Sequence, residues 1–112
     1  MTYTEEQLNQ CREVVICILD PDKRRELAHN PNTTPETLDY LSHDVDWGVC
    51  YWVARNPNTK TETLDYLSKD VAWDVRCGVA SNPNTTRKTL DFLSRDLDPD
   101  VLRRVASNPK NR

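Results

Sequence analysis

Glycine is scarce in this chain of 112 residues, which contains only Gly48 and Gly78. Phosphate-binding loops need several glycines close together, because their backbone amides must approach the phosphate oxygens closely. A glycine-rich nucleotide-binding loop is therefore excluded. The two histidines, His29 and His43, stand at no spacing typical of a Ser/His/Asp or Cys/His arrangement. We therefore predict that the protein is not an enzyme and has no catalytic residues.

Long apolar segments are also lacking. The longest run, Val14–Leu19, is far too short to span a bilayer, and residues 1–6 lack the basic start of a secretory signal. We therefore expect a cytoplasmic protein with no membrane partner, in which thiols stay reduced. The four cysteines are Cys11, Cys17, Cys50 and Cys77. Their spacing makes no tetrahedral set with His29, so we predict no metal site and no cofactor.

Neither sign of charge dominates, since the formal net charge is −3 and charged residues make up 29% of the chain. No overall field therefore draws the protein toward nucleic acid or anionic lipid. Apolar residues reach 37% and aromatic residues 7%, which is lean for a globule of this size. This composition favours an elongated protein in which each unit buries its apolar face only against its neighbours.

A repeat of 26 residues runs through most of the chain. Asn-Pro-Asn-Thr occurs at residues 30–33, 56–59 and 82–85, and Asn-Pro-Lys-Asn begins at residue 108. Leucine, aspartate and Val-Ala positions keep the same phase in every unit. We therefore divide the single domain 1–112 into a leading segment 1–19, a half repeat 20–29, full repeats 30–55, 56–81 and 82–107, and a truncated tail 108–112.

Each unit is predicted to contain two short helices. Asn-Pro-Asn-Thr ends one helix, because proline cannot continue it, and the Thr-Pro pair that follows it in the first full repeat is typical of a helix start. Leu38, Leu41 and Val45 then lie at helical spacing, which predicts that they share one buried face. The second helix presents Val49 and Val53 four residues apart, again on one face.

The expected start of the second helix is an aspartate that caps its free amides. Asp20, Asp46 and Asp98 occupy this position, with Ala72 as the exception. The leading segment 1–19 is predicted to form a capping helix, because it opens with a capping-box pattern and then shows apolar residues at helical spacing. Its β-branched run leaves a strand as the alternative.

The unit Asn-Pro-Asn-Thr…Leu…Leu…Asp…Val…Val-Ala resembles the leucine-rich repeat variant family over residues 20–112. This resemblance implies a right-handed superhelix in which α-helices alternate with shorter, 3₁₀-like helices. The expected fold class is therefore an all-α, right-handed α-solenoid of two-helix repeats with an N-terminal capping helix. Some members carry an iron–sulfur cysteine cluster ahead of the repeats, but Cys11 and Cys17 form no Cys-x-x-Cys pair.

Comparison among the repeats separates scaffold positions from positions that are free to serve recognition. On a helical wheel, Val49, Cys50, Val53 and Ala54 form an arc that should face the core. The opposite, outward arc of the second helices, which also includes Gly48, carries Trp, Tyr and Arg, the residue types enriched at binding hot spots. The candidate binding residues on this arc are Arg25, His29, Trp47, Tyr51, Trp52, Arg55, Trp73, Cys77, Arg103 and Arg104.

Three functions remain open from these observations. The first is binding of a protein or peptide through the outer arc of the second helices. The second is nucleic-acid binding through the arginines of the same helices, which are Arg24, Arg25, Arg55, Arg76, Arg103 and Arg104. The third is self-association through an apolar C-terminal end formed by Leu90, Leu93, Leu97 and Val101. Trp47 and Trp73 have a structural alternative, which is to cover the end of a neighbouring helix.

Overall fold

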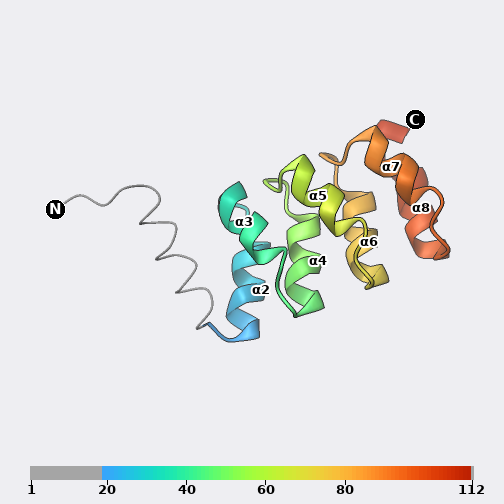
Figure 1. The fold of residues 1–112 in the computed structure, drawn as a ribbon. Coiled ribbons are helices and arrows are strands. Elements are labelled where there is room, and N and C mark those ends of the chain that lie inside the picture. The colour runs from blue at the N-terminus through green and yellow to red at the C-terminus, as the bar shows by residue number, and fades with distance from the viewer. Residues whose placement is uncertain (1–18, 112) are drawn as a thin grey trace.

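The computed structural model describes residues 19–111, and this part of the chain is helical, with no strand (Figure 1). The α-helices are α2 (Pro21–His29), α3 (Pro35–Leu41), α4 (Trp47–Arg55), α5 (Thr61–Leu67), α6 (Trp73–Ser81), α7 (Arg87–Leu93) and α8 (Pro99–Ser107), followed by the 3₁₀ helix η1 (Pro109–Asn111). The predicted all-α class is confirmed. The predicted capping helix over 1–19 lies outside the described residues, apart from Leu19.

The helices are arranged in two rows along an axis of 51 Å, with the other two extents 24 and 19 Å (Figure 1). α2, α4, α6 and α8 pack side by side and form the first of these rows, called here the long-helix row. α3, α5 and α7 form the short-helix row and pack mainly on the long helices. The long helices have nine residues each and the short helices seven. The second helix of each unit is therefore a regular α-helix and is the longer of the two.

Side-chain caps set where the helices begin. The carboxylates of Asp20, Asp46 and Asp98 accept hydrogen bonds from backbone amides in the first turns of α2, α4 and α8, as predicted. Ala72, at the same position before α6, makes no such bond. In the short-helix row, the Thr34 hydroxyl accepts from the Thr37 amide in the same way. Each cap satisfies an amide that the first turn of a helix leaves without a partner.

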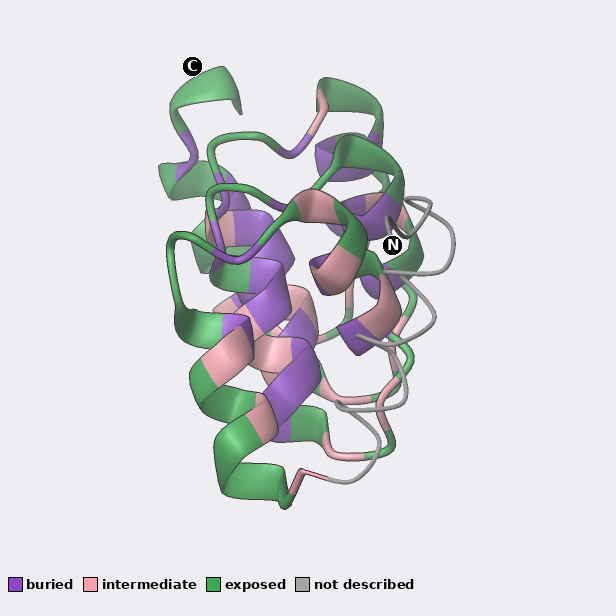
Figure 2. Ribbon diagram, turned by 90° about the vertical axis from the view of Figure 1, so that its left-hand side faces the viewer, coloured by how far each residue is buried: buried purple, intermediate pink, exposed green. Residues whose placement is uncertain are grey.

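The core lies between the two rows and is built from the leucine and valine positions of the repeat (Figure 2). Leu38 and Leu41 are buried, as are Val49 and Val53 and their equivalents in the later units. Val45 was predicted to join this face, and that prediction is wrong, because its side chain is 99% exposed. α3 ends at Leu41, so Val45 lies in the loop after the helix. The helical spacing that would place it on the buried face therefore does not apply to it.

The Asn-Pro-Asn-Thr motif does more than end a helix, because its first asparagine also joins adjacent units. The Asn56 side-chain amide donates to the carbonyl oxygens of Ala28 (2.8 Å), in the last turn of α2, and of Asn30 (2.9 Å), the equivalent asparagine one unit earlier. Asn82 repeats this pair of bonds to Ala54 and Asn56, and Asn108 repeats it to Ala80 and Asn82. These buried bonds satisfy carbonyl groups that a helix C-terminus leaves without partners.

The threonine of the motif bonds to the long helix that comes directly before the motif in the chain. The Thr59 hydroxyl donates to the Val53 carbonyl at 2.6 Å, and Thr85 does the same to Val79. The bond closes the loop back onto the end of the long helix that precedes it. The asparagine and threonine bonds together account for the recurrence of the motif at every junction between units.

Candidate functional site

The exposed face of the long-helix row carries a cluster of aromatic side chains centred on α4. Tyr51 lies between two tryptophans, with its ring centroid 6.4 Å from Trp47 and 5.2 Å from Trp52. Both ring pairs are close to perpendicular, at 72° and 74°. Trp52 extends the cluster to α2, where its ring packs edge-to-face against His29 with the two ring centroids 4.3 Å apart. Edge-to-face pairs of this kind are attractive and hold the rings in defined orientations.

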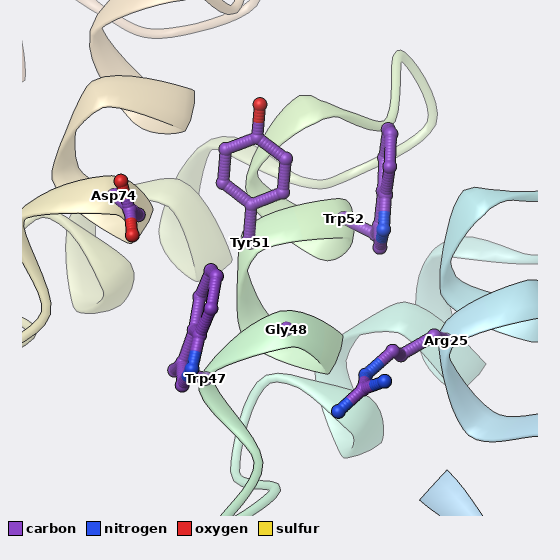
Figure 3. Close-up of a pocket in the computed structure, with 6 residues that line it drawn as sticks. All are labelled: Arg25, Trp47, Gly48, Tyr51, Trp52 and Asp74. Atoms are coloured by element: carbon purple, nitrogen blue, oxygen red, sulfur yellow. The ribbon is translucent and has the colours of Figure 1, made fainter. Parts of the chain in front are cut away.

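These rings line an open pocket of about 460 Å³, called here the aromatic pocket (Figure 3). Its lining residues come from three helices of the long-helix row and are Arg25, Trp47, Gly48, Tyr51, Trp52 and Asp74. Trp47 and Trp52 stand on opposite sides of Gly48, and Asp74 lies on the α6 side (Figure 3). Because α2, α4 and α6 each contribute, the pocket exists only when three successive units are stacked.

Gly48 keeps the lower part of the pocket free of side chain. The helical wheel placed this residue on the outer surface, but it is buried. A Cβ atom at this position would lie 2.7 Å from Nε of Arg25 and 3.1 Å from a carboxylate oxygen of Asp46. The glycine therefore allows the Arg25 side chain to cross close over the α4 backbone.

The charged groups of the pocket differ in how they are paired. The Arg25 guanidinium donates to Asp46 at 2.7 Å and to Asp22 at 3.2 Å. Asp74, in contrast, accepts no hydrogen bond and forms no ion pair with any residue in the range 19–111. The charged lining group that is left for an incoming ligand is therefore a carboxylate.

A comparison of the repeats explains why Asp74 has no partner. In α2, Asp22 pairs with Arg25 three residues later, and in α8, Asp100 pairs with Arg103 at 2.9 Å in the same way. The residue three positions after Asp74 is Cys77, which offers no cation. Sequence reasoning missed Asp74 as a site residue, although the missing arginine was a signal that it could have used.

Arg55 lies outside the pocket lining and contacts the aromatic cluster from the C-terminal end of α4. Its guanidinium carbon lies 5.8 Å from the centroid of the Tyr51 ring, and the same group donates to the Tyr51 hydroxyl at 3.0 Å. This is a cation–π contact combined with a hydrogen bond. It holds the Tyr51 ring in place.

The remaining predicted site residues are spread over the rest of the row. Trp47 and Trp73 are 56% and 46% exposed, so neither is sealed inside the stack. Arg103 and Arg104 are exposed on α8 and lie outside the aromatic pocket. Five of the ten predicted residues, Arg25, His29, Trp47, Tyr51 and Trp52, are therefore brought together at or beside the pocket, with Arg55 against Tyr51.

The prediction that Cys77 lies on the outer surface is wrong, because its side chain is only 8% exposed. Tyr51 and Arg103 occupy the same phase of the repeat and reach out of the row because they are long. A thiol at that position is short and stays below the surrounding side chains. Burial, together with Asp98 and other carboxylates, raises the pKa of the Cys77 thiol.

Cys50 is buried more deeply than Cys77, and its thiol bonds to backbone carbonyl groups. Its thiol donates to the carbonyl oxygens of Ser42 and Asp44, both at 3.3 Å. Burial and the nearby carboxylate of Asp70 raise the pKa of the Cys50 thiol to about 12. The thiol therefore stays protonated at neutral pH and is a poor nucleophile and metal ligand.

We expect Cys50 to resist alkylation in the folded protein. At pH 8, a pKa near 12 leaves roughly two thousandfold less thiolate than the ordinary value of about 8.5. Labelling by iodoacetamide, read out by peptide mass mapping, should therefore be slower by about that factor than labelling in urea. Equal labelling rates for Cys50 in the folded protein and in urea would show that the thiol is neither buried nor raised in pKa.

The described residues hold no group of three or more His, Cys, Asp and Glu side chains placed to bind a metal ion. None of the helices between residues 19 and 111 has the length and apolar character needed to cross a membrane. The aromatic pocket is thus built from stacked rings, one glycine and a carboxylate without a partner. No known protein family, curated protein or solved structure matches this chain.

Proposed function

We propose that the protein is a non-enzymatic scaffold, a right-handed α-solenoid of the leucine-rich repeat variant type, that binds a peptide or protein through the exposed face of its long-helix row. The observation that supports this most directly is the aromatic pocket. Two of its rings, Tyr51 and Trp52, have no aromatic equivalent in the other units, so the stacking of units does not require them. The leucine and valine positions of the repeat build the frame, and these two rings are additions to it.

The make-up of the pocket is typical of protein-binding surfaces. Trp, Tyr and Arg dominate hot spots, because they combine a large contact area with a polar group and lose little rotamer freedom. Trp47 is more than half exposed and Tyr51 and Trp52 are partly exposed, so each ring has area left to bury against a partner. The ring pairs hold these side chains in place, which lowers the entropy cost of binding.

Nucleic-acid binding is the less favoured function, because the arginines proposed for it are largely occupied. Arg24 and Arg76 lie in part-buried ion pairs with Asp44 and Asp96, each at 2.7 Å. Arg25 is held between two carboxylates, as described above. A guanidinium that is already paired adds little to the attraction for phosphate.

Self-association through the predicted C-terminal residues is also less favoured. Leu90, Leu93 and Val101 are buried within the chain and leave no apolar area for a second copy. The expectation that they form an open end is wrong, because α8 and η1 pack over α7. Leu97 is exposed, but it lies in the loop before α8 and not on an end surface shared with the other three.

The proposed function predicts that the protein selects a related set of peptides from a displayed random library, and that the aromatic pocket carries this binding. In a variant with Trp47→Ala and Tyr51→Ala, the affinity for the selected peptides should fall roughly thirtyfold or more, since hot-spot truncations cost about 2 kcal/mol or more. Titration calorimetry measures the affinity, and circular dichroism checks that the helix content is unchanged.

A matched control removes two half-exposed aromatic rings from the short-helix row, with Tyr66→Ala and Phe92→Ala. This variant should bind the selected peptides as the unmodified protein does. If it loses as much affinity as the pocket variant, or if the pocket variant keeps full affinity, the long-helix row is not the binding surface.

A further inference from the structure

We propose that the aromatic pocket receives the guanidinium group of an arginine side chain from the partner. This inference rests on the proposed function and names the chemistry of the residue that occupies the site. It is carried by three features found together, which are perpendicular aromatic rings, a carboxylate without a partner and a resident arginine that is already neutralised.

The sign of the ligand's charge follows from the pairing of the lining groups. Arg25 is the cation of the pocket, and its guanidinium is held by Asp22 and Asp46. Asp74 is the lining anion that has no ion pair among the described residues. An anionic ligand would meet a guanidinium whose charge two carboxylates already neutralise, and it would face Asp74 at the same time. A cationic ligand meets a free carboxylate without breaking any bond.

The aromatic walls favour the same sign. The faces of Trp and Tyr rings carry negative potential, and Trp is the strongest of the aromatic side chains in attracting cations. Trp47, Tyr51 and Trp52 present three such rings around one space (Figure 3). An apolar side chain would gain from the rings but would cover Asp74 without supplying a donor, which is costly for a carboxylate.

A guanidinium fits these walls better than an ammonium ion. It is planar and weakly hydrated, so it stacks on an aromatic face at low desolvation cost, and its N–H groups can bond a carboxylate in pairs. A lysine ammonium holds its water more tightly and cannot stack in this way. The protein already contains one such contact at the cluster, where the Arg55 guanidinium lies over Tyr51 and donates to its hydroxyl.

The direct test uses small probes of matched shape. We expect Nα-acetyl-arginine amide to shift the indole N–H signals of Trp47 and Trp52 in nitrogen–proton NMR spectra, with an affinity on the order of millimolar. The Trp73 signal should stay in place. The citrulline analogue has nearly the same shape without the charge and should bind on the order of tenfold more weakly. Equal binding of the two probes would overturn the proposal.

Variants of two equivalent aspartates sharpen this test. Asp74→Asn should weaken arginine binding on the order of tenfold, because it removes the charged acceptor of the pocket. Asp100→Asn changes the same repeat position in α8, where the carboxylate pairs with Arg103 outside the pocket. It should leave arginine binding unchanged. Equal effects of the two substitutions, or no effect of Asp74→Asn, would show that Asp74 is not the acceptor.

The outcome also separates this inference from the proposed function. If the displayed library yields peptides that bind through the pocket but share no arginine, the scaffold function stands and the arginine assignment is wrong. If the arginine probe binds with the expected preference over citrulline and no peptide is selected, the pocket chemistry stands and the peptide-scaffold function fails.

Discussion

Replacing Asn82 with alanine should destabilise the protein by about 3 kcal/mol, because this one buried side chain joins the C-terminal ends of α4 and α6. Asn82 is 2% exposed, and its amide donates to the carbonyl oxygens of Ala54 and Asn56. Its own side-chain oxygen accepts from the Asn84 amide at 2.9 Å. Alanine removes all three bonds and leaves the two carbonyl groups and the Asn84 amide without these partners. A buried polar group without its bond costs more than the bond contributes when it is made.

Asn82→Asp is the more specific test, because it keeps the shape of the side chain and replaces the NH₂ donor with a carboxylate oxygen. The carboxylate would face two carbonyl oxygens with no cation beside it, so we expect a larger loss of stability at pH 7 than with alanine, on the order of 4 kcal/mol. The folded state would raise the pKa of this carboxyl above its unfolded value. The penalty is therefore full above the folded pKa, and it should shrink as the pH falls below that value.

Urea unfolding followed by circular dichroism measures these changes, with each variant compared with the unmodified protein at the same pH. Asn84→Ala is the control within the same loop. Asn84 is exposed, and its side-chain amide donates across to Pro57, so the expected loss is about 1 kcal/mol or less. If Asn82→Ala unfolds at the same urea concentration as the unmodified protein, the buried asparagine bonds do not hold the units together.

The second large effect concerns two valines four positions apart that the repeat pattern does not distinguish. Val75 lies in α6 and is fully buried, whereas Val71 lies in the loop before α6 and is 97% exposed. The identical substitution, valine to alanine, should cost about 2.5 kcal/mol at Val75, because it removes two buried methyl groups and leaves a cavity. At Val71 it should change stability by less than about 0.5 kcal/mol.

The same urea experiment measures this pair, and the two variants control for each other because the chemical change is identical. A loss at Val71 as large as that at Val75 would mean that the loop valine is covered in solution by another part of the chain or by a second copy. Concentration dependence of the Val71 variant's stability would then separate these two cases, since only association depends on concentration.

Much of the fold was predictable because its causes are local. The positions of the helix starts follow from caps and prolines that act within four residues, as at Asp46 and Asp98. Leu38, Leu41, Val49 and Val53 were identified as core from spacing alone, and all four are buried. Because the sequence repeats every 26 residues, a helix start or core position identified in one unit applies to the equivalent positions of the others.

The predictions that failed concern helix ends and tertiary contacts, which residue spacing alone does not determine. Val45 has the spacing of a core residue, but the helix stops short of it, and burial depends on where the next element packs. Cys77 and Gly48 lie on the arc predicted to face outward, yet neighbouring side chains cover both. A helical wheel describes one helix and contains no information about the depth to which adjacent helices shield it.

The candidate site was also predictable only in part. The repeat pattern identified its rings, since Tyr51 and Trp52 occur in one unit only and Trp47 stands where other units have proline. Only the tertiary structure joined them to Arg25 and Asp74 in one pocket and showed which of the two charges is already neutralised. Periodicity and capping act within a few residues, whereas the pocket and the asparagine bonds join positions more than 20 residues apart, which meet only when the units stack.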